Sequence, residues 1–134
     1  MIKLMFVEDD PDQLMVYEFK FSREGILMIP AKDRDEVFEH IVDKPDIILL
    51  DVLLREDNGL DILEKLKQDD RYAHIPVIVF SNFDKQEARD RAESLGAIDY
   101  IIKSQTDPIE MTKKIKDFIE TGVYTKGLAM NDAM

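Results

Sequence analysis

The chain has 134 residues and no cysteine, which excludes disulfide bonds, thiolate catalysis and zinc–thiolate sites. Its net charge of −11 argues against non-specific binding to nucleic acid, which needs a positive surface, and permits binding of cations and basic partners. The apolar fraction of 45% is ordinary for a folded domain and no apolar stretch is long enough to span a membrane, so we expect one soluble, cytoplasmic domain.

Five short apolar runs predict five β-strands, and a polar or helix-periodic segment follows each run. The runs cover residues 2–7, 26–31, 46–52, 75–81 and 98–103. They are mostly continuous rather than alternating, which is typical of strands buried on both faces of a parallel sheet.

Apolar residues at steps of three and four predict helices between the strands. The stripes are Leu14, Tyr17 and Phe21 with Phe19 beside them, then Val37, Phe38, Ile41 and Val42, then Leu60, Leu63 and Leu66, and finally Met111, Ile115, Phe118 and Ile119. The segment 84–95 differs, because its apolar face has only Ala88, Ala92 and Leu95, which predicts a charged, weakly anchored surface helix. This alternation of strand and helix predicts a doubly wound α/β domain over residues 1–121, with a flexible tail at 122–134.

Polar side chains stand where the predicted strands end. Glu8, Asp9 and Asp10 follow the first strand, Asp51 lies at the end of the third, and Ser81 and Lys103 close the fourth and fifth. In open parallel sheets, ligands bind beyond the carboxyl ends of the strands, so we expect these groups to converge at one edge. Clustered carboxylates favour a hard cation such as Mg²⁺. Together with an ammonium and a hydroxyl group, they are the parts needed to transfer a phosphoryl group onto a carboxylate.

In order and spacing, these segments resemble the receiver domains of two-component response regulators. The resemblance covers residue 2 to about residue 121, and it rests on VEDD (7–10), DIILLDV (46–52), Gly59, PVIVFS (76–81) and GAIDYIIK (96–103). It implies a flavodoxin-like fold, with a five-stranded parallel sheet in the order 2-1-3-4-5 and five helices.

The resemblance also implies roles for single residues. Asp51 would accept a phosphoryl group from a sensor histidine kinase or a histidine phosphotransfer protein, and Ser81 and Lys103 would bind the phosphoryl oxygens. Mg²⁺ would be held by the side chains of Glu8 (through a water), Asp9 and Asp51 and by the carbonyl of Leu53. Ser81 and Tyr100 would form the switch pair.

By the same resemblance, the protein is not a classical enzyme, although it assists its own phosphorylation and dephosphorylation. The readout surface would be the fourth helix, fifth strand and fifth helix. No output domain follows Thr121, so we expect a single-domain regulator that acts on a downstream protein target without direct contact with nucleic acid or membrane.

Several positions depart from the family pattern. Arg55 and Ser104 stand where the family often has proline, the second usually after a cis bond, and Asn82 replaces a small residue after the switch hydroxyl. Asn82 is therefore a candidate to restrict access to Asp51 or to hinder movement of Ser81. Leu53 and Phe83 are apolar, and our hypothesis is that they shield the acyl phosphate from water.

Three alternative functions stay open at the level of sequence. The departures favour a receiver-like interaction module that no longer switches. A phosphatase of the haloacid dehalogenase type would also use an aspartyl phosphate, but its second aspartate would be needed where this chain has Leu53. A flavodoxin-like cofactor binder would need a phosphate-cradling loop, and none is evident.

Overall fold

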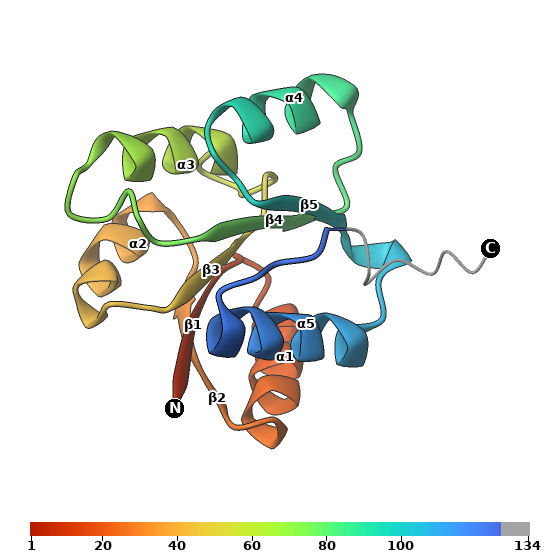
Figure 1. Cartoon of the computed structure of the whole chain (residues 1–134). Helices are drawn as coiled ribbons and strands as arrows, with labels where there is room; N and C mark the ends of the chain where they lie inside the picture. Colours follow the sequence, from red (N-terminus) through yellow and green to blue (C-terminus); the bar gives the residue numbers. More distant parts are fainter. Residues whose placement is uncertain (127–134) are drawn as a thin grey trace.

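A five-stranded parallel sheet lies between two layers of helices in the computed structural model, which describes residues 1–126 (Figure 1). The strands are β1 (Ile2–Val7), β2 (Ile26–Ala31), β3 (Ile47–Leu50), β4 (Val77–Ser81) and β5 (Asp99–Ile102). They follow the order β2-β1-β3-β4-β5, and every pair is parallel. The predicted doubly wound fold and its strand order are confirmed.

The helices cover both faces of this sheet. They are α1 (Pro11–Arg23), α2 (Arg34–His40), α3 (Gly59–Gln68), α4 (Gln86–Ser94) and α5 (Pro108–Thr121), with short 3₁₀ helices η1 (Ile41–Asp43) and η2 (Lys103–Gln105). Helices α1 and α5 lie on one face, and α2, α3 and α4 lie on the other (Figure 1).

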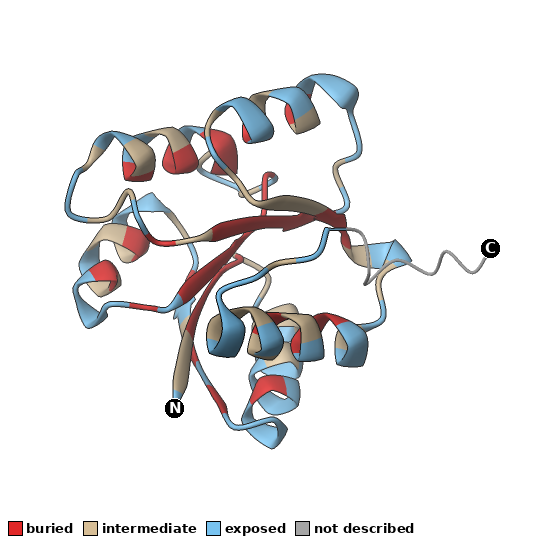
Figure 2. Ribbon diagram, viewed as in Figure 1, coloured by how far each residue is buried: buried red, intermediate tan, exposed pale blue. Residues whose placement is uncertain are grey.

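The apolar core lies on both faces of the sheet, as the continuous apolar runs predict. Every residue of β3 and β4 is buried (Figure 2). In β1, Leu4 and Phe6 pack toward α1 and α5, whereas Met5 and Val7 pack toward the other three helices. Central strands buried on both sides give the carboxyl edge of the sheet a rigid base.

Residues with known capping preferences stand at several helix ends. The side chain of Asp10 caps α1 by accepting a hydrogen bond from the N–H of Asp12 at 2.9 Å, and Asp107 caps α5 in the same way before Pro108. Gly25 follows α1 with φ = 76°, a conformation that glycine adopts at no steric cost.

Helix α4 has the thin apolar face that its sequence predicts. Ala88 and Ala92 are its buried residues, while most of its other side chains are charged. Two residues assigned to apolar stripes are instead exposed. Phe19 is 63% exposed on α1, and Val42 is 62% exposed because α2 ends before it and the chain turns into η1.

The chain continues past α5 along the edge of the sheet. Gly122 ends α5 in the left-handed conformation, and the hydroxyl of Tyr124 then donates a hydrogen bond to Asp99 Oδ2 at 2.7 Å. The Tyr124 ring packs edge-on against Phe118. The remainder of the predicted tail, 127–134, lies outside the described residues. Within the described part of the chain, no helix has both the length and the apolar character needed to cross a membrane.

Candidate functional site

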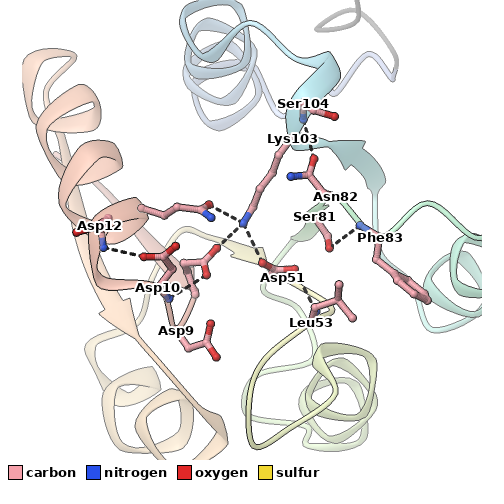
Figure 3. A network of polar contacts seen from close by, with 12 residues as sticks. Asp9, Asp10, Asp12, Asp51, Leu53, Ser81, Asn82, Phe83, Lys103 and Ser104 are labelled. Carbon is pink, nitrogen blue, oxygen red and sulfur yellow. Dashed lines mark hydrogen bonds and ion pairs between the residues drawn. The ribbon is translucent and has the colours of Figure 1, made fainter.

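The polar residues singled out by sequence gather at the carboxyl edge of the sheet, where β1, β3, β4 and β5 end (Figure 3). The N–H of Asp51 donates to the carbonyl of Val7 at 3.1 Å, which fixes the end of β3 beside the end of β1. Glu8, Asp51 and Ser81 are all buried despite their polarity. Buried polar groups need partners, so their contacts define the site.

Lys103 is the centre of these contacts. Its Nζ atom donates to Asp51 Oδ2 at 2.8 Å, to Gln13 Oε1 at 2.8 Å, and to Glu8 Oε1 (Figure 3). The Lys103 side chain is 7% exposed, and those of Asp51 and Glu8 are 9% and 3% exposed. One ammonium group is therefore shared by two enclosed carboxylates. Gln13 could not be predicted from the sequence, because an amide in the first turns of a helix carries no distinctive signal.

The pKa values of Glu8 and Lys103 are both shifted in this enclosed cluster. Burial raises the pKa of Glu8 above its ordinary value, and the hydrogen bonds from Lys103 and from the N–H of Asp10 offset this only in part. For Lys103, burial acts to lower the pKa, but the hydrogen bonds to Asp51 and Glu8 outweigh it, so the pKa is raised. Lys103 therefore carries a positive charge at neutral pH.

Asp9 lies at the same edge but makes a separate contact. Its Oδ2 atom accepts a hydrogen bond from the N–H of Arg55 at 2.6 Å, and Figure 3 shows its side chain turned away from Lys103. The Arg55 guanidinium is only 3.9 Å from the same oxygen and is largely exposed. A proline in place of Arg55 would have no N–H to donate, so this departure from the family pattern adds a bond between the β3–α3 loop and Asp9.

The donor atoms suit a hard cation, although they do not form a closed metal site. Three carboxylates and the carbonyl of Leu53 make an oxygen-only set, which Mg²⁺ prefers. Within residues 1–126, no three acidic or histidine side chains are grouped so that they could hold a metal ion. The carboxylates of Glu8 and Asp51 accept hydrogen bonds from Lys103, and that of Asp9 accepts one from the N–H of Arg55. The residues fit Mg²⁺ by their chemistry, and the Arg55 contacts engage one of the two carboxylate oxygens of Asp9.

Ser81 and Tyr100 meet at the backbone of Phe83. Ser81 Oγ accepts a hydrogen bond from the N–H of Phe83 at 3.1 Å, and the Tyr100 hydroxyl donates to the carbonyl of the same residue. Tyr100 N–H donates to Asp99 Oδ1 at 2.8 Å, and Asp99 is also the acceptor for Tyr124. A chain of hydrogen bonds thus joins Ser81 to the segment that follows α5.

Leu53 and Phe83 do not together form the apolar shield over Asp51 that we expected from the sequence. Leu53 is near Asp51 and donates its N–H to Asp51 Oδ1 at 3.1 Å, but the residue is 56% exposed. The Phe83 ring points away from Asp51 in Figure 3 and packs against the core under α3 and α4. Phe83 therefore contributes to this site through its backbone.

Asn82 and Ser104, two of the residues that depart from the family pattern, are in contact with each other. Asn82 Oδ1 accepts a hydrogen bond from the N–H of Ser104 at 2.8 Å (Figure 3). No peptide bond within the described residues is cis, and the Lys103–Ser104 bond is accordingly trans.

Comparison with known proteins gives a consistent result. The family model of the response regulator receiver domain matches residues 4–116. The transcriptional regulatory protein CpxR of Escherichia coli K12 is 28% identical over 132 residues, which are 98% of this chain and 55% of CpxR. The phosphate regulon transcriptional regulatory protein PhoB of the same strain is 30% identical over 115 residues, which are 85% of this chain and 50% of PhoB. The chain spans about half the length of these curated relatives.

Solved structures share the fold. The BeF3-activated receiver domain of RstA from Klebsiella pneumoniae has a TM-score of 0.79 at 24% identity, over 89% of this chain and 99% of that one. A two-component response regulator from Clostridium difficile has a TM-score of 0.81 at 20% identity, over 91% and 98% of the two chains.

Proposed function

Because the chain belongs to the response regulator receiver domain family, we propose that it is a phosphorylation-dependent switch in which Asp51 accepts the phosphoryl group. The observation that carries this proposal is the buried contact between Asp51 and Lys103 at the carboxyl edge of the sheet. An acceptor carboxylate beside a fixed cation is arranged for a reaction in which negative charge accumulates on phosphoryl oxygens. We also propose that the receiver domain comprises residues 1–121.

The donor is a phosphohistidine of a sensor histidine kinase or of a histidine phosphotransfer protein. An Asp51 carboxylate oxygen attacks phosphorus, a P–O bond forms, and the P–N bond breaks with its electron pair going to the imidazole. Lys103 then binds one phosphoryl oxygen, and the Ser81 hydroxyl donates to another after it leaves the N–H of Phe83. Glu8 (through a water), Asp9, Asp51 and the carbonyl of Leu53 would hold Mg²⁺, which would neutralise part of the charge on the transferred phosphoryl group.

The output is a change in protein contacts. Ser81 and Tyr100 act as the switch pair, because both form a hydrogen bond with the backbone of Phe83. A movement of one therefore displaces the residue to which the other is bonded. The weakly anchored helix α4 lies directly after this loop. The target is a downstream protein rather than nucleic acid, given the net charge of −11. On this proposal the chain assists its own phosphorylation and dephosphorylation and acts on no separate substrate.

The test is incubation with acetyl phosphate and Mg²⁺, followed by intact-protein mass spectrometry. We expect the mass of one phosphoryl group to be added to the wild type and to Asp70→Asn, which removes an exposed carboxylate, and not to Asp51→Asn. Failure of the wild type to gain this mass would favour a receiver-like module that no longer switches. A gain that persists in Asp51→Asn would assign the acceptor elsewhere.

A further inference from the structure

Asn82 and Ser104 each follow a residue that we assign to phosphoryl binding, and their hydrogen bond joins the two loops beyond the sheet. The register of β4 and β5 ends at the pair Ser81 and Ile102. One residue beyond Ser81 and two beyond Ile102, the side chain of Asn82 accepts a hydrogen bond from the N–H of Ser104 at 2.8 Å. This contact therefore continues the link between β4 and β5 where the backbone ladder has stopped.

The contact also gives a hydrogen-bond acceptor to a backbone N–H at the start of η2. The first N–H groups of a helix have no partner within the helix, and Ile102, which precedes η2, provides no side-chain cap. Asn82 Oδ1 supplies the acceptor from another loop. Ser104 can donate because it is not proline, so the two residues form a matched donor and acceptor.

Both residues are exposed, which decides what the bond can do. A hydrogen bond that exchanges readily with water contributes little to the free energy of unfolding. It does select one orientation of the Asn82 side chain, which is directed toward η2 rather than over Asp51 (Figure 3). Without this bond, the amide is free to turn toward the mouth of the site beside Ser81.

We propose that Ser104 and Asn82 form a positioning pair that keeps the Asn82 amide clear of Asp51 and so leaves the acceptor open to the phosphoryl donor. The inference rests on the proposed function of Asp51. Asn82 then obstructs phosphorylation least while its amide oxygen accepts the hydrogen bond from Ser104.

The test compares Ser104→Pro, which removes the N–H, with Ser104→Ala, which retains it. With acetyl phosphate as donor, we expect Ser104→Pro to be phosphorylated about threefold more slowly than Ser104→Ala, a factor in the range of one net hydrogen bond. Asn82→Leu, which is similar in size but has no acceptor, should be slowed to the same extent. Adding Asn82→Ala to Ser104→Pro should restore the rate, because the obstructing side chain is gone.

Restoration of the phosphorylation rate in the double variant would distinguish the positioning of Asn82 from damage to the loop. If the double variant stays as slow as Ser104→Pro, the proline acts by displacing Lys103 and the inference is wrong. Equal rates for Ser104→Pro and Ser104→Ala would also overturn it. Hydrogen exchange of the Ser104 amide, which needs no phosphorylation, should be faster in Asn82→Ala than in the wild type. A wild type and Ser104→Ala that both take no phosphoryl group would instead refute the proposed function.

Discussion

The Nζ atom of Lys103 lies 2.8 Å from Asp51 Oδ2, and neither side chain is more than 9% exposed. The same nitrogen holds Glu8 and Gln13, so one cation serves two enclosed carboxylates. When one partner of a buried ion pair is removed, the remaining charge is poorly solvated, and this cost exceeds what the pair itself contributes. Lys103 is therefore a structural centre of the site as well as a candidate phosphoryl ligand.

The first prediction is that Lys103→Met lowers the free energy of unfolding by about 3 kcal/mol at pH 7, because Glu8 and Asp51 lose their counter-charge. Urea unfolding measures this difference. The control is Lys116→Met, whose pair with Glu24 spans 4.0 Å between partly exposed side chains and should contribute less than about 1 kcal/mol. Similar losses for the two variants would show that the Lys103 contacts are not enclosed in solution.

The second prediction concerns Glu8, whose pKa is raised above its ordinary value of 4.5 by burial. Between pH 4.5 and the raised pKa, the folded protein holds a proton on Glu8 that the unfolded chain has lost. The free energy of unfolding should therefore fall as pH rises through this range, by at most about 1.4 kcal/mol per pH unit. Urea unfolding at a series of pH values should show this fall in the wild type and a smaller one in Glu8→Gln. The exposed Glu120→Gln variant should retain the wild-type slope, and a loss of slope there would contradict the assignment to Glu8.

Much of the site was predictable because it depends on where strands end. Continuous apolar runs place Asp51, Ser81 and Lys103 at strand termini, and parallel strands bring their carboxyl ends to one edge. The buried contact of Asp51 with Lys103 follows from that arrangement. The thin apolar face of α4 was equally clear, since the apolar positions of segment 84–95 are two alanines and one leucine.

The remaining contacts depend on loop paths that no periodic pattern encodes. Gln13 contacts Lys103 from the first turn of α1, and an isolated glutamine gives no sign of this contact. The bonds from the N–H groups of Arg55 and Ser104 involve the backbone, whose direction in a loop is set by tertiary packing. The resemblance to the family marks these two positions as departures, and in the structure each N–H has a hydrogen-bond acceptor.

The third prediction is that Gly59→Ala destabilises the protein although Gly59 begins α3. An added Cβ would lie 1.9 Å from the backbone oxygen of Asp51, which is far inside contact distance, so the end of β3 must shift. We expect a loss of about 1–3 kcal/mol in urea unfolding, against the gain that alanine normally gives a helix. Phosphorylation by acetyl phosphate should also slow, since the displaced residue is the proposed acceptor. Lys65→Ala, at an exposed position of the same helix, should change neither quantity, and an equally benign Gly59→Ala would show that the strand end is not packed this tightly.

The fourth prediction separates the backbone of Arg55 from its charge. The Arg55 N–H donates to Asp9 Oδ2 at 2.6 Å and so competes with a metal ion for one of the two carboxylate oxygens. Arg55→Ala removes the guanidinium but retains the N–H, whereas Arg55→Pro removes both. We therefore expect Arg55→Pro to bind Mg²⁺ about fivefold more tightly than Arg55→Ala, the factor for one net hydrogen bond, as measured by isothermal titration calorimetry. If the two variants bind Mg²⁺ equally, the Arg55 N–H does not compete with the metal ion for Asp9. If Arg55→Pro binds more weakly, the N–H of Arg55 instead holds Asp9 ready for the metal ion.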